Sequence, residues 1–414
     1  MHDIPANLAK EVFDATWRLV EADCRQTISS NEWSELGQEF KNVLNRHPEL
    51  AALHNNLAVW FEVNDEFSSA IQHFKHAVAS APGNALYHYN LGRALGSIGN
   101  FERYAEETEE ALRLAPKWVP GLIALAQAYM LLARQDQAVA VLEQSLEVDP
   151  SHSDLWSAMG FVHLSAGRTD EALTAALKAA EMEPSHAVKF MTLASVYWGR
   201  GQQQESEAAS RKAIELDPGY AEAYDSLAVD IIARLGGRLP EDPTTGSPED
   251  FAIERWQDRP AEELAIIAEA ERLGRRAIEL NQDLGGPHVN LGNILLLRGA
   301  VVEAEKVLRK AIELDPNGQA ASAYNSLAYR FAGWGIRLDE ALQFAQHAVQ
   351  LAPEGNFFDT LAMVHFRRGE WDQAEAAWEK CIELAGSQGD PGAWYHLGKL
   401  YERSLSESLC AGQN

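Results

Sequence analysis

Cysteine is scarce in this chain of 414 residues, which contains only Cys24, Cys381 and Cys410. Disulfide-stabilised secreted domains pair their cysteines in even numbers, and thiolate metal cages need several cysteines at close spacing. Three widely separated cysteines meet neither requirement. We therefore expect buried or idle thiols in a reducing compartment, and neither a disulfide framework nor a cysteine-based metal site.

Positive charge is also in short supply, since 35 Lys and Arg residues face 61 Asp and Glu residues, for a formal net charge of −26. Binding to a phosphate backbone depends on clustered cations that displace counterions. The charge balance therefore argues against nucleic acid and anionic membranes as partners. The excess of acid has two interpretations: a solvated exterior that keeps a long molecule soluble, or a surface for basic partners.

Long apolar runs are missing too. No uninterrupted run approaches the roughly 18 residues that a membrane-spanning helix needs, so we expect no membrane insertion. The N-terminal stretch carries Asp3, Glu11, Asp14 and Glu21 where a secretory leader would need an apolar core. These absences predict a cytoplasmic protein, unless a leader has already been removed from the chain.

What the sequence does contain is a period of 34 residues. Prolines recur at this interval at Pro82, Pro116, Pro150, Pro184 and Pro218. Small residues keep the same step at Ala58, Gly92, Ala126, Gly160, Ala194 and Ala228, and resume 64 residues later at Gly292. A fixed period of this length is typical of repeat proteins built by stacking similar units. The gap of 64 equals one period plus 30 extra residues.

Each unit has the pattern of two helices. In residues 85–118, apolar residues recur at helical spacing on both sides of the "GSIGN" break, with Leu91 and Leu95 before it and Tyr104, Ala111 and Leu112 after it. Proline ends the second helix, because it lacks an N–H and forces the preceding residue out of the α region. A small residue at the eighth position of the unit allows the two helices to approach closely. Neighbouring units must then stack to bury their apolar stripes.

The period, the "NLG" or "SLA" near the start of the unit, the small residue near position 20 and the closing Asp-Pro together resemble the tetratricopeptide repeat. The resemblance covers nine units from about Ala51 to Gln388. It implies an all-α, right-handed α-solenoid superhelix of about nine to ten helix-turn-helix repeats with a capping helix. Tyr104, Ser206 and Ser210 depart from the residues usual in the pattern, and Gln282 and Gly386 replace the closing proline, so we expect looser joints at these positions.

The repeat register predicts the organisation of the whole chain. Residues 1–50 form N-terminal helices and a degenerate first repeat, residues 51–235 and 260–388 form repeat units, residues 236–259 are a loop insertion within a repeat, and residues 389–414 form a C-terminal capping helix. The insertion has the Gly, Pro, Ser and acid content of a loop. Its Trp256 either fastens the loop to the scaffold or anchors a partner.

Chemistry-bearing motifs are absent from the sequence. No glycine loop has the spacing and the Lys-Ser/Thr that phosphate binding requires, and no nucleophile can be paired with a base. His73 and His76 lie three residues apart on a second helix, but the sequence places no third metal ligand. We therefore expect no cofactor, no metal site and no catalytic activity.

In proteins that this chain resembles, the first helices line the concave face of the superhelix. That resemblance implies a partner-binding groove formed by Asn56, Tyr89, Asn90, Arg93, Ile123, Gln127, Phe161, Met191 and Trp198. Arg93 and the asparagines would hold polar groups of a partner, and the other residues would bury apolar anchors. Two alternatives stay open: the apolar residues are helix-packing core, and the asparagines, which share unit position 6 with Asn290, bond between helices instead of to a peptide.

The predicted function is a non-catalytic scaffold or adaptor that binds a peptide or helix of partner proteins in its concave groove. The alternative is a regulatory or substrate-recruiting subunit of an enzyme complex whose active site lies on another chain. Protein or peptide partners are expected in both cases. The sequence does not determine the oligomeric state.

Overall fold

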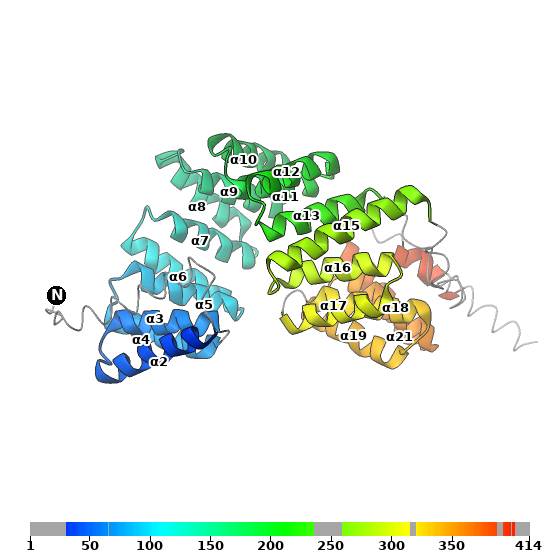
Figure 1. Ribbon diagram of the computed structural model, residues 1–414, viewed down its shortest axis with the longest axis horizontal. Helices are drawn as coiled ribbons and strands as arrows, with labels where there is room; N and C mark the ends of the chain where they lie inside the picture. Colours follow the sequence, from blue (N-terminus) through cyan, green and yellow to red (C-terminus); the bar gives the residue numbers. More distant parts are fainter. Residues whose placement is uncertain are drawn as a thin grey trace, which may run out of the picture. The chain divides into compact units, whose positions relative to one another are not determined.

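The structure is a computed structural model that describes residues 30–64, 66–235, 259–314, 320–386, 392–398 and 400–401. Across these residues the long elements are α-helices, and no strand is present. Consecutive helices pack against each other as pairs (Figure 1). The prediction of an all-α chain built from helix pairs is thus confirmed.

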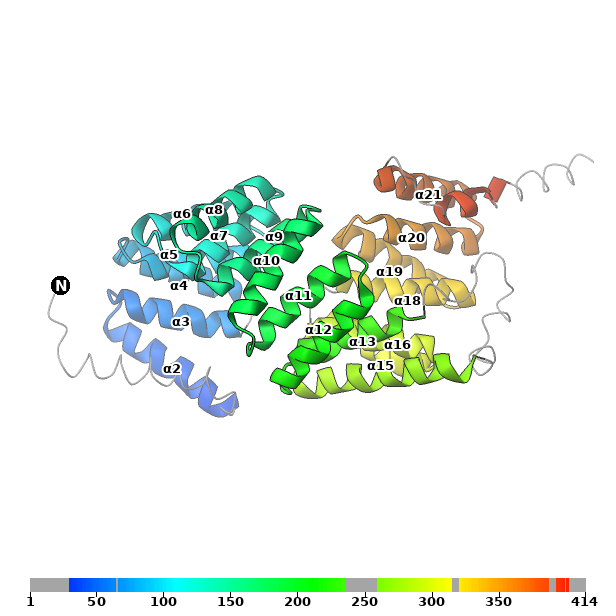
Figure 2. The same ribbon diagram turned by 90° about the horizontal axis from the view of Figure 1, so that it is seen from above.

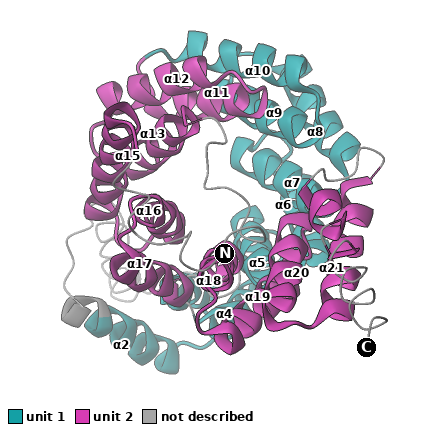
Figure 3. Ribbon diagram, turned by 90° about the vertical axis from the view of Figure 1, so that its right-hand side faces the viewer, with its two compact units in different colours: residues 1–184 teal, residues 185–414 magenta. Residues whose placement is uncertain are grey.

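Two compact units divide the chain, Met1–Pro184 and Ser185–Asn414 (Figure 3). The series of prolines runs through Pro184 with its period unchanged, so the sequence contains no local signal for this division.

The described part of the first unit consists of helix α2 (Ser30–Arg46) and four helix pairs. The pairs are α3 (Ala51–Val63) with α4 (Phe67–Ser80), α5 (Ala85–Ser97) with α6 (Phe101–Leu114), α7 (Val119–Leu131) with α8 (Gln135–Val148), and α9 (Ser153–Ser165) with α10 (Thr169–Met182). The first helices α3, α5, α7 and α9 also contact one another in chain order. They therefore form one continuous face of this unit.

The second unit continues the same arrangement. Its pairs are α11 (Ala187–Gly199) with α12 (Gln203–Leu216), α13 (Ala221–Ala233) with α15 (Ala261–Leu280), α16 (Gly285–Leu297) with α17 (Val301–Leu314), α18 (Ala320–Trp334) with α19 (Leu338–Leu351), and α20 (Gly355–Arg368) with α21 (Trp371–Ala385). Figure 2 shows α18 to α21 following one another along this unit. Residues 392–398 are helical again, and Leu397 is buried with Trp378 of α21.

The predicted insertion falls almost wholly on residues 236–258, which lie outside the described residues, and Trp256 lies there with it. Helices α13 and α15 flank that segment and pack on each other as one pair. Two helices separated by the insertion thus still form a single repeat.

Small residues allow the close packing within each pair. The alanines at the eighth position of their units are fully buried, as at Ala58, Ala194 and Ala228. Where glycine takes this position, a Cβ on Gly292 would lie 2.5 Å from Cγ of Leu308 in the partner helix. The neighbouring atoms leave no space for a larger side chain, because protein interiors are packed as densely as organic crystals.

Aromatic rings tie four of the first helices to the end of the preceding repeat. Ring nitrogens of His54, His88 and Trp156 lie 3.0 Å from the carbonyl oxygens of Pro48, Pro82 and Pro150, respectively. In the second unit the hydroxyl of Tyr224 donates to the carbonyl of Pro218 over 3.3 Å. In every case the ring belongs to the fourth residue of the unit and the carbonyl lies six residues earlier.

The expectation of looser joints at the irregular positions is wrong at two of its sites. Ser206 and Ser210 both donate hydrogen bonds to the buried carboxylate of Asp230, over 2.7 and 2.9 Å. The serines are small enough for the position, and their hydroxyls add a bond that alanine cannot make. This joint between α12 and α13 is therefore hydrogen-bonded rather than loose.

Tyr104, the third irregular residue, fits because its neighbour has no side chain. A Cβ built on Gly96 would lie 2.8 Å from the ring of Tyr104. The ring therefore occupies the space that Gly96 leaves open, and Tyr104 is buried. A large residue in one helix is compensated by a small one in its partner.

Candidate functional site

A cleft of about 420 Å³ opens on the first-helix face of the first unit. Four of the residues predicted to bind a partner line it, namely Tyr89, Arg93, Ile123 and Gln127. The remaining lining residues are Tyr104, Val119, Pro120, Ala124, His152 and Asp154. The cleft thus combines one exposed cation with aromatic, aliphatic and amide groups.

Helical spacing brings these four residues together. Tyr89 and Arg93 lie four residues apart on α5, and Ile123 and Gln127 lie four apart on α7, so each pair projects from one face of its helix. Asn84 caps the start of helix α5, and its side chain accepts a hydrogen bond from the Leu86 N–H over 3.0 Å. The cap therefore fixes where α5 starts, and with it which residues of α5 reach the cleft.

Tyr89 and Arg93 form the polar and aromatic wall. The ring of Tyr89 packs against Trp118 with a centroid separation of 4.8 Å, and the guanidinium of Arg93 lies 5.8 Å from the Tyr89 centroid. Arg93 Nη2 is 3.7 Å from Glu62 Oε1. Burial raises the pKa of Glu62, and the charge of Arg93 opposes that rise. Because Arg93 is about half exposed, its guanidinium has donors that face solvent.

The opposite wall is formed by α7. The Tyr104 hydroxyl is 3.5 Å from the amide oxygen of Gln127, and burial raises the pKa of Tyr104 to about 12. Tyr104 therefore stays protonated and acts as a donor near neutral pH. Ile123 is partly buried and packs on the core of the unit, while Gln127 is exposed. This wall offers an aliphatic contact and an amide side by side.

Asn56 and Asn90, which were predicted to hold polar groups of a partner, have hydrogen-bond partners within the chain. Both are buried, and Asn90 donates its amide to Asn55 Oδ1 over 2.8 Å, while Asn55 donates to Asn56 Oδ1 over 3.4 Å. In the second unit Asn290 donates to both carboxylate oxygens of Asp225, at 3.1 and 3.0 Å. Asn90 and Asn290 therefore bond between neighbouring first helices, as the helix-to-helix alternative expects, whereas Asn56 accepts its bond within its own helix.

The other predicted residues do not line the cleft. Phe161 projects from α9 of the first unit with 42% of its surface exposed. Met191 and Trp198 belong to α11 of the second unit, where Met191 packs on a small core cluster and Trp198 is 43% exposed. Trp256 lies outside the described residues. The structure therefore brings together only part of the predicted groove.

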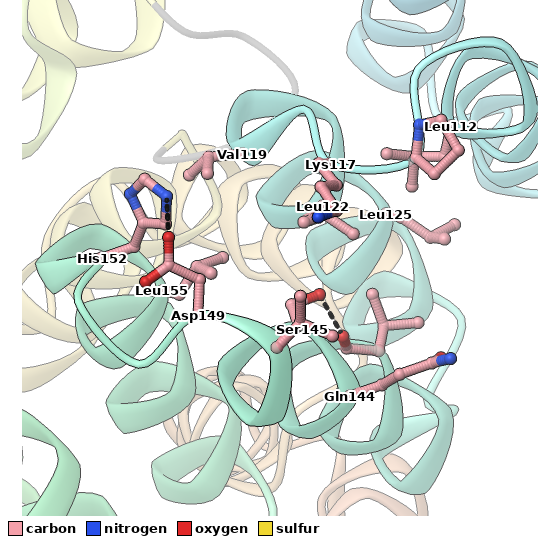
Figure 4. A pocket seen from close by; sticks show the side chains of 13 residues that line it. Leu112, Lys117, Val119, Leu122, Leu125, Gln144, Ser145, Asp149, His152 and Leu155 are labelled. Carbon is pink, nitrogen blue, oxygen red and sulfur yellow. Dashed lines mark hydrogen bonds and ion pairs between the residues drawn. The ribbon is translucent and has the colours of Figure 1, made fainter.

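A second pocket was not predicted. It measures about 550 Å³ and is enclosed by α6, α7, α8 and the start of α9 (Figure 4). Its lining comprises Leu112, Pro116, Lys117, Val119, Leu122, Leu125, Val141, Gln144, Ser145, Val148, Asp149, His152 and Leu155. The sequence signal was available: Leu122 is the fourth residue of its unit, where His54, His88 and Trp156 carry rings.

The histidines considered as metal ligands lie next to a third one. His73 Nδ1 is 3.0 Å from His54 Nδ1, and the ring of His54 stacks on His76 at 5.0 Å. The Pro48 carbonyl can only accept, so His54 carries its proton on Nε2 and its Nδ1 accepts from His73. Burial, with help from His54 and His76, lowers the pKa of His73 to about 4. Among the described residues no group of three or more His, Cys, Asp or Glu side chains is arranged to hold a metal ion.

The helices that the structure describes include none with both the length and the apolar content needed to cross a bilayer.

Comparison with known proteins identifies the repeat. Tetratricopeptide repeat signatures match residues 123–188, 190–220, 287–317 and 360–380. No curated protein sequence matches the chain.

Solved structures share the architecture. The human IFIT1 dimer with m7Gppp-AAAA is similar at 13% identity and a TM-score of 0.51, over 93% of this chain and 92% of that one. A tetratricopeptide repeat protein from Parabacteroides merdae has 15% identity and a TM-score of 0.47, over 67% of this chain and 96% of its own. TTC0263 of Thermus thermophilus has 22% identity and a TM-score of 0.40, over 44% of this chain and 100% of its own. At these identities, and with only the first score above 0.5, the likeness supports the fold alone.

Proposed function

We propose, from the premise that the chain is a tetratricopeptide repeat protein with multiple motifs, that it is a scaffold or adaptor. Such repeats typically mediate protein–protein interactions, and proteins built from them are generally non-catalytic. In this proposal the chain binds an extended peptide or a helix of a partner protein on the first-helix face of its first unit. The partner's own chemistry, and not catalysis by this chain, then determines the biological result.

One observation carries the proposal: Tyr89, Arg93, Ile123 and Gln127 come from two different repeats and line a single cleft. Peptide grooves need apolar surface for affinity and a few polar groups to fix orientation. Ile123 and the ring of Tyr89 supply the first, and Gln127 and Arg93 supply the second. The exposed guanidinium of Arg93 suits a carboxylate or a main-chain carbonyl of the partner.

RNA is the competing kind of partner, because IFIT1 was solved with m7Gppp-AAAA. The net charge of −26 favours protein over RNA, since RNA binding requires clustered cations. The cleft contains one arginine and no lysine, together with Asp154. We therefore assign the cleft to a peptide.

The test is selection of peptides from a displayed random library on the full chain, followed by fluorescence polarisation with a selected peptide. The double variant Arg93→Ala with Ile123→Ala should weaken binding about tenfold or more, because an anchoring pocket and a charge-assisted bond are lost together. Leu131→Ala is the matched control: Leu131 is exposed on the same helix, outside the cleft, so this variant should bind like the native chain.

Native-like affinity in the double variant, with its circular dichroism unchanged, contradicts the proposal. A single-stranded oligoadenylate that binds the native chain more tightly than any selected peptide, with strong salt dependence, also contradicts it and assigns the cleft to RNA.

A further inference from the structure

The inference starts from the rings at the fourth position of each unit. His54, His88 and Trp156 each hold a proline carbonyl six residues earlier through a ring nitrogen. These rings also reach the second helix of their own pair. His54 bonds to His73, and His88 bonds to Glu107 over 2.8 Å. A ring with a hydrogen-bond donor therefore closes the seam between the two helices in three of the four pairs described in the first unit.

Trp156 closes its seam in a slightly different way. The ammonium of Lys178, from α10, lies 3.9 Å from the centroid of the Trp156 ring. The ring is thus held between the Pro150 carbonyl and a side chain of the second helix. Cation–π contacts of this kind add to the apolar contacts of the ring.

The pair α7–α8 lacks all of these groups. Leu122 replaces the ring, Val141 stands where His73 and Glu107 stand, and Gln144 stands where Lys178 stands. All three line the 550 Å³ pocket, together with Pro116. Figure 4 shows Leu122 and Gln144 among the lining side chains. The pocket is therefore located where the neighbouring repeats place their own rings.

Pro116 retains the acceptor that the missing ring would have used. Among the residues that the structure describes, none donates a hydrogen bond to the Pro116 carbonyl. Two other polar groups of the pocket are engaged: Ser145 donates to the Val141 carbonyl over 2.7 Å, and Asp149 accepts from Ser151 and lies 3.3 Å from His152. Lys117 and Gln144 also line the pocket. Leucine and valine side chains form most of the remaining wall, including Leu112, Leu125 and Leu155.

We propose that this pocket receives a tryptophan side chain of a partner peptide, with the indole N–H donating to the Pro116 carbonyl. The proposal rests on the proposed function, since a partner peptide supplies the ring. The indole would occupy the place that Trp156 occupies in the next repeat. A volume of 550 Å³ also lies in the usual range of ligand pockets and leaves space for residues beside the ring.

The pocket and the first-helix cleft share two residues, Val119 and His152. A single extended peptide can therefore contact Arg93 and Ile123 in the cleft and place a tryptophan in the pocket. The two sites are continuous within one unit, which is the reason to assign the ring to a peptide.

The experiment uses a pentapeptide with 5-fluorotryptophan between alanines, whose binding to the full chain is followed by ¹⁹F NMR. Leu122→Trp should lower its affinity about tenfold or more, because the chain's own ring then fills the pocket. Leu131→Trp, which adds a ring to the same helix outside the pocket, should leave the affinity unchanged. If Leu122→Trp misfolds, Leu122→His introduces the ring of His54 and His88 and gives the same test.

The hydrogen bond is tested with a second probe. A pentapeptide with fluorophenylalanine in place of the fluorotryptophan keeps a ring but has no donor, and should bind the native chain about threefold to tenfold more weakly. Equal binding of the tryptophan probe to the native chain and Leu122→Trp overturns the proposal. Equal affinities of the two probes overturn the role of the Pro116 carbonyl.

Two further variants separate this proposal from others. The double variant Arg93→Ala with Ile123→Ala should bind the short tryptophan probe as tightly as the native chain does, because neither residue lines the pocket. A failure of the cleft proposal can therefore be told apart from a failure of the pocket proposal. Trp256→Ala should also leave the affinity unchanged. A rise in affinity in Trp256→Ala would show that the chain's own tryptophan competes for the pocket, and would overturn the assignment to a partner.

Discussion

Two adjacent helix pairs of the first unit, α7–α8 and α9–α10, have the same lengths, with 13 residues in each first helix and 14 in each second. The pair α9–α10 is closed by Trp156, which bonds to a proline carbonyl and lies under Lys178. The pair α7–α8 has Leu122 at the same position and contains the larger pocket. The seam between the two helices is thus filled where the fourth residue of the unit is a ring, and open where Leu122 takes its place.

The turns of the two pairs differ as well. Gly167 ends the first helix of the closed pair with φ of 72°, which glycine adopts at little cost. Ala133 occupies the equivalent turn of the open pair with φ of 55°, in the left-handed region that a Cβ disfavours. The open pair thus departs from its neighbours at two positions that a repeat normally optimises. Departures of this kind are expected where a site is built into a scaffold.

The largest expected effect comes from opening the closed pair. Trp156→Leu should lower the free energy of unfolding by about 2–3 kcal/mol, because a large partly buried ring, its hydrogen bond and its cation–π contact are lost. Urea denaturation followed by circular dichroism measures the change. Trp394→Leu is the control, since Trp394 is 54% exposed. A shift in Trp156→Leu no larger than that of the control would mean that the ring does not hold the seam.

The comparison of helix pairs extends to their dependence on pH. Neutral histidines close the seam of α3–α4, whereas Trp156, which does not titrate, closes the seam of α9–α10. The pKa of His73 falls from 6.5 to about 4 in the folded chain. At pH values between these two, His73 of the unfolded chain is protonated and His73 of the folded chain is not. Stability is therefore lost as the pH falls from 7 towards 4. We expect a loss of about 1–2 kcal/mol, after allowing for the solvent that reaches this half-buried ring.

His73→Gln supplies the matched variant for this pH effect. The glutamine amide can still donate to His54 but does not titrate, so the urea midpoint of His73→Gln should fall less between pH 7 and pH 5 than that of the native chain. The same fall in both proteins would exclude His73 as the cause.

The smallest expected effect concerns the turn of the open pair. Ala133→Gly should raise the free energy of unfolding by about 1 kcal/mol, because glycine removes the Cβ clash at positive φ. Gly167→Ala makes the reverse change in the closed pair and should lower the free energy of unfolding by about the same amount. Thermal unfolding of the two variants beside the native chain gives both signs. If Ala133→Gly unfolds at a temperature as low as that of Gly167→Ala, the turn at Ala133 is not strained.

The sequence was sufficient to predict the helix pairs, because the 34-residue period and the small residues at fixed positions record how each pair packs. The resemblance to the repeat family also implied that Tyr89, Arg93, Ile123 and Gln127 share a face, and helical spacing accounts for the two residues contributed by each helix. The division of the chain after Pro184 could not be predicted, because the repeat pattern does not change there.

Side-chain pairing across repeats was the part that sequence reasoning missed. Whether Asn90 faces a partner or bonds to Asn55 depends on the distance between two helices, which no spacing rule supplies. The bonds from Ser206 and Ser210 to Asp230 likewise join two different repeats. The pocket at Leu122, in contrast, leaves a signal that is visible when the fourth residues of successive units are compared.

Hydrogen–deuterium exchange of the full chain, with and without a saturating selected peptide, tests the central claim most directly. The account predicts slower exchange of the amides in α5 and α7 and at the start of α9, where the cleft and the pocket meet at Val119 and His152. Protection confined to residues 185–414, with α5 to α9 unchanged, would contradict it.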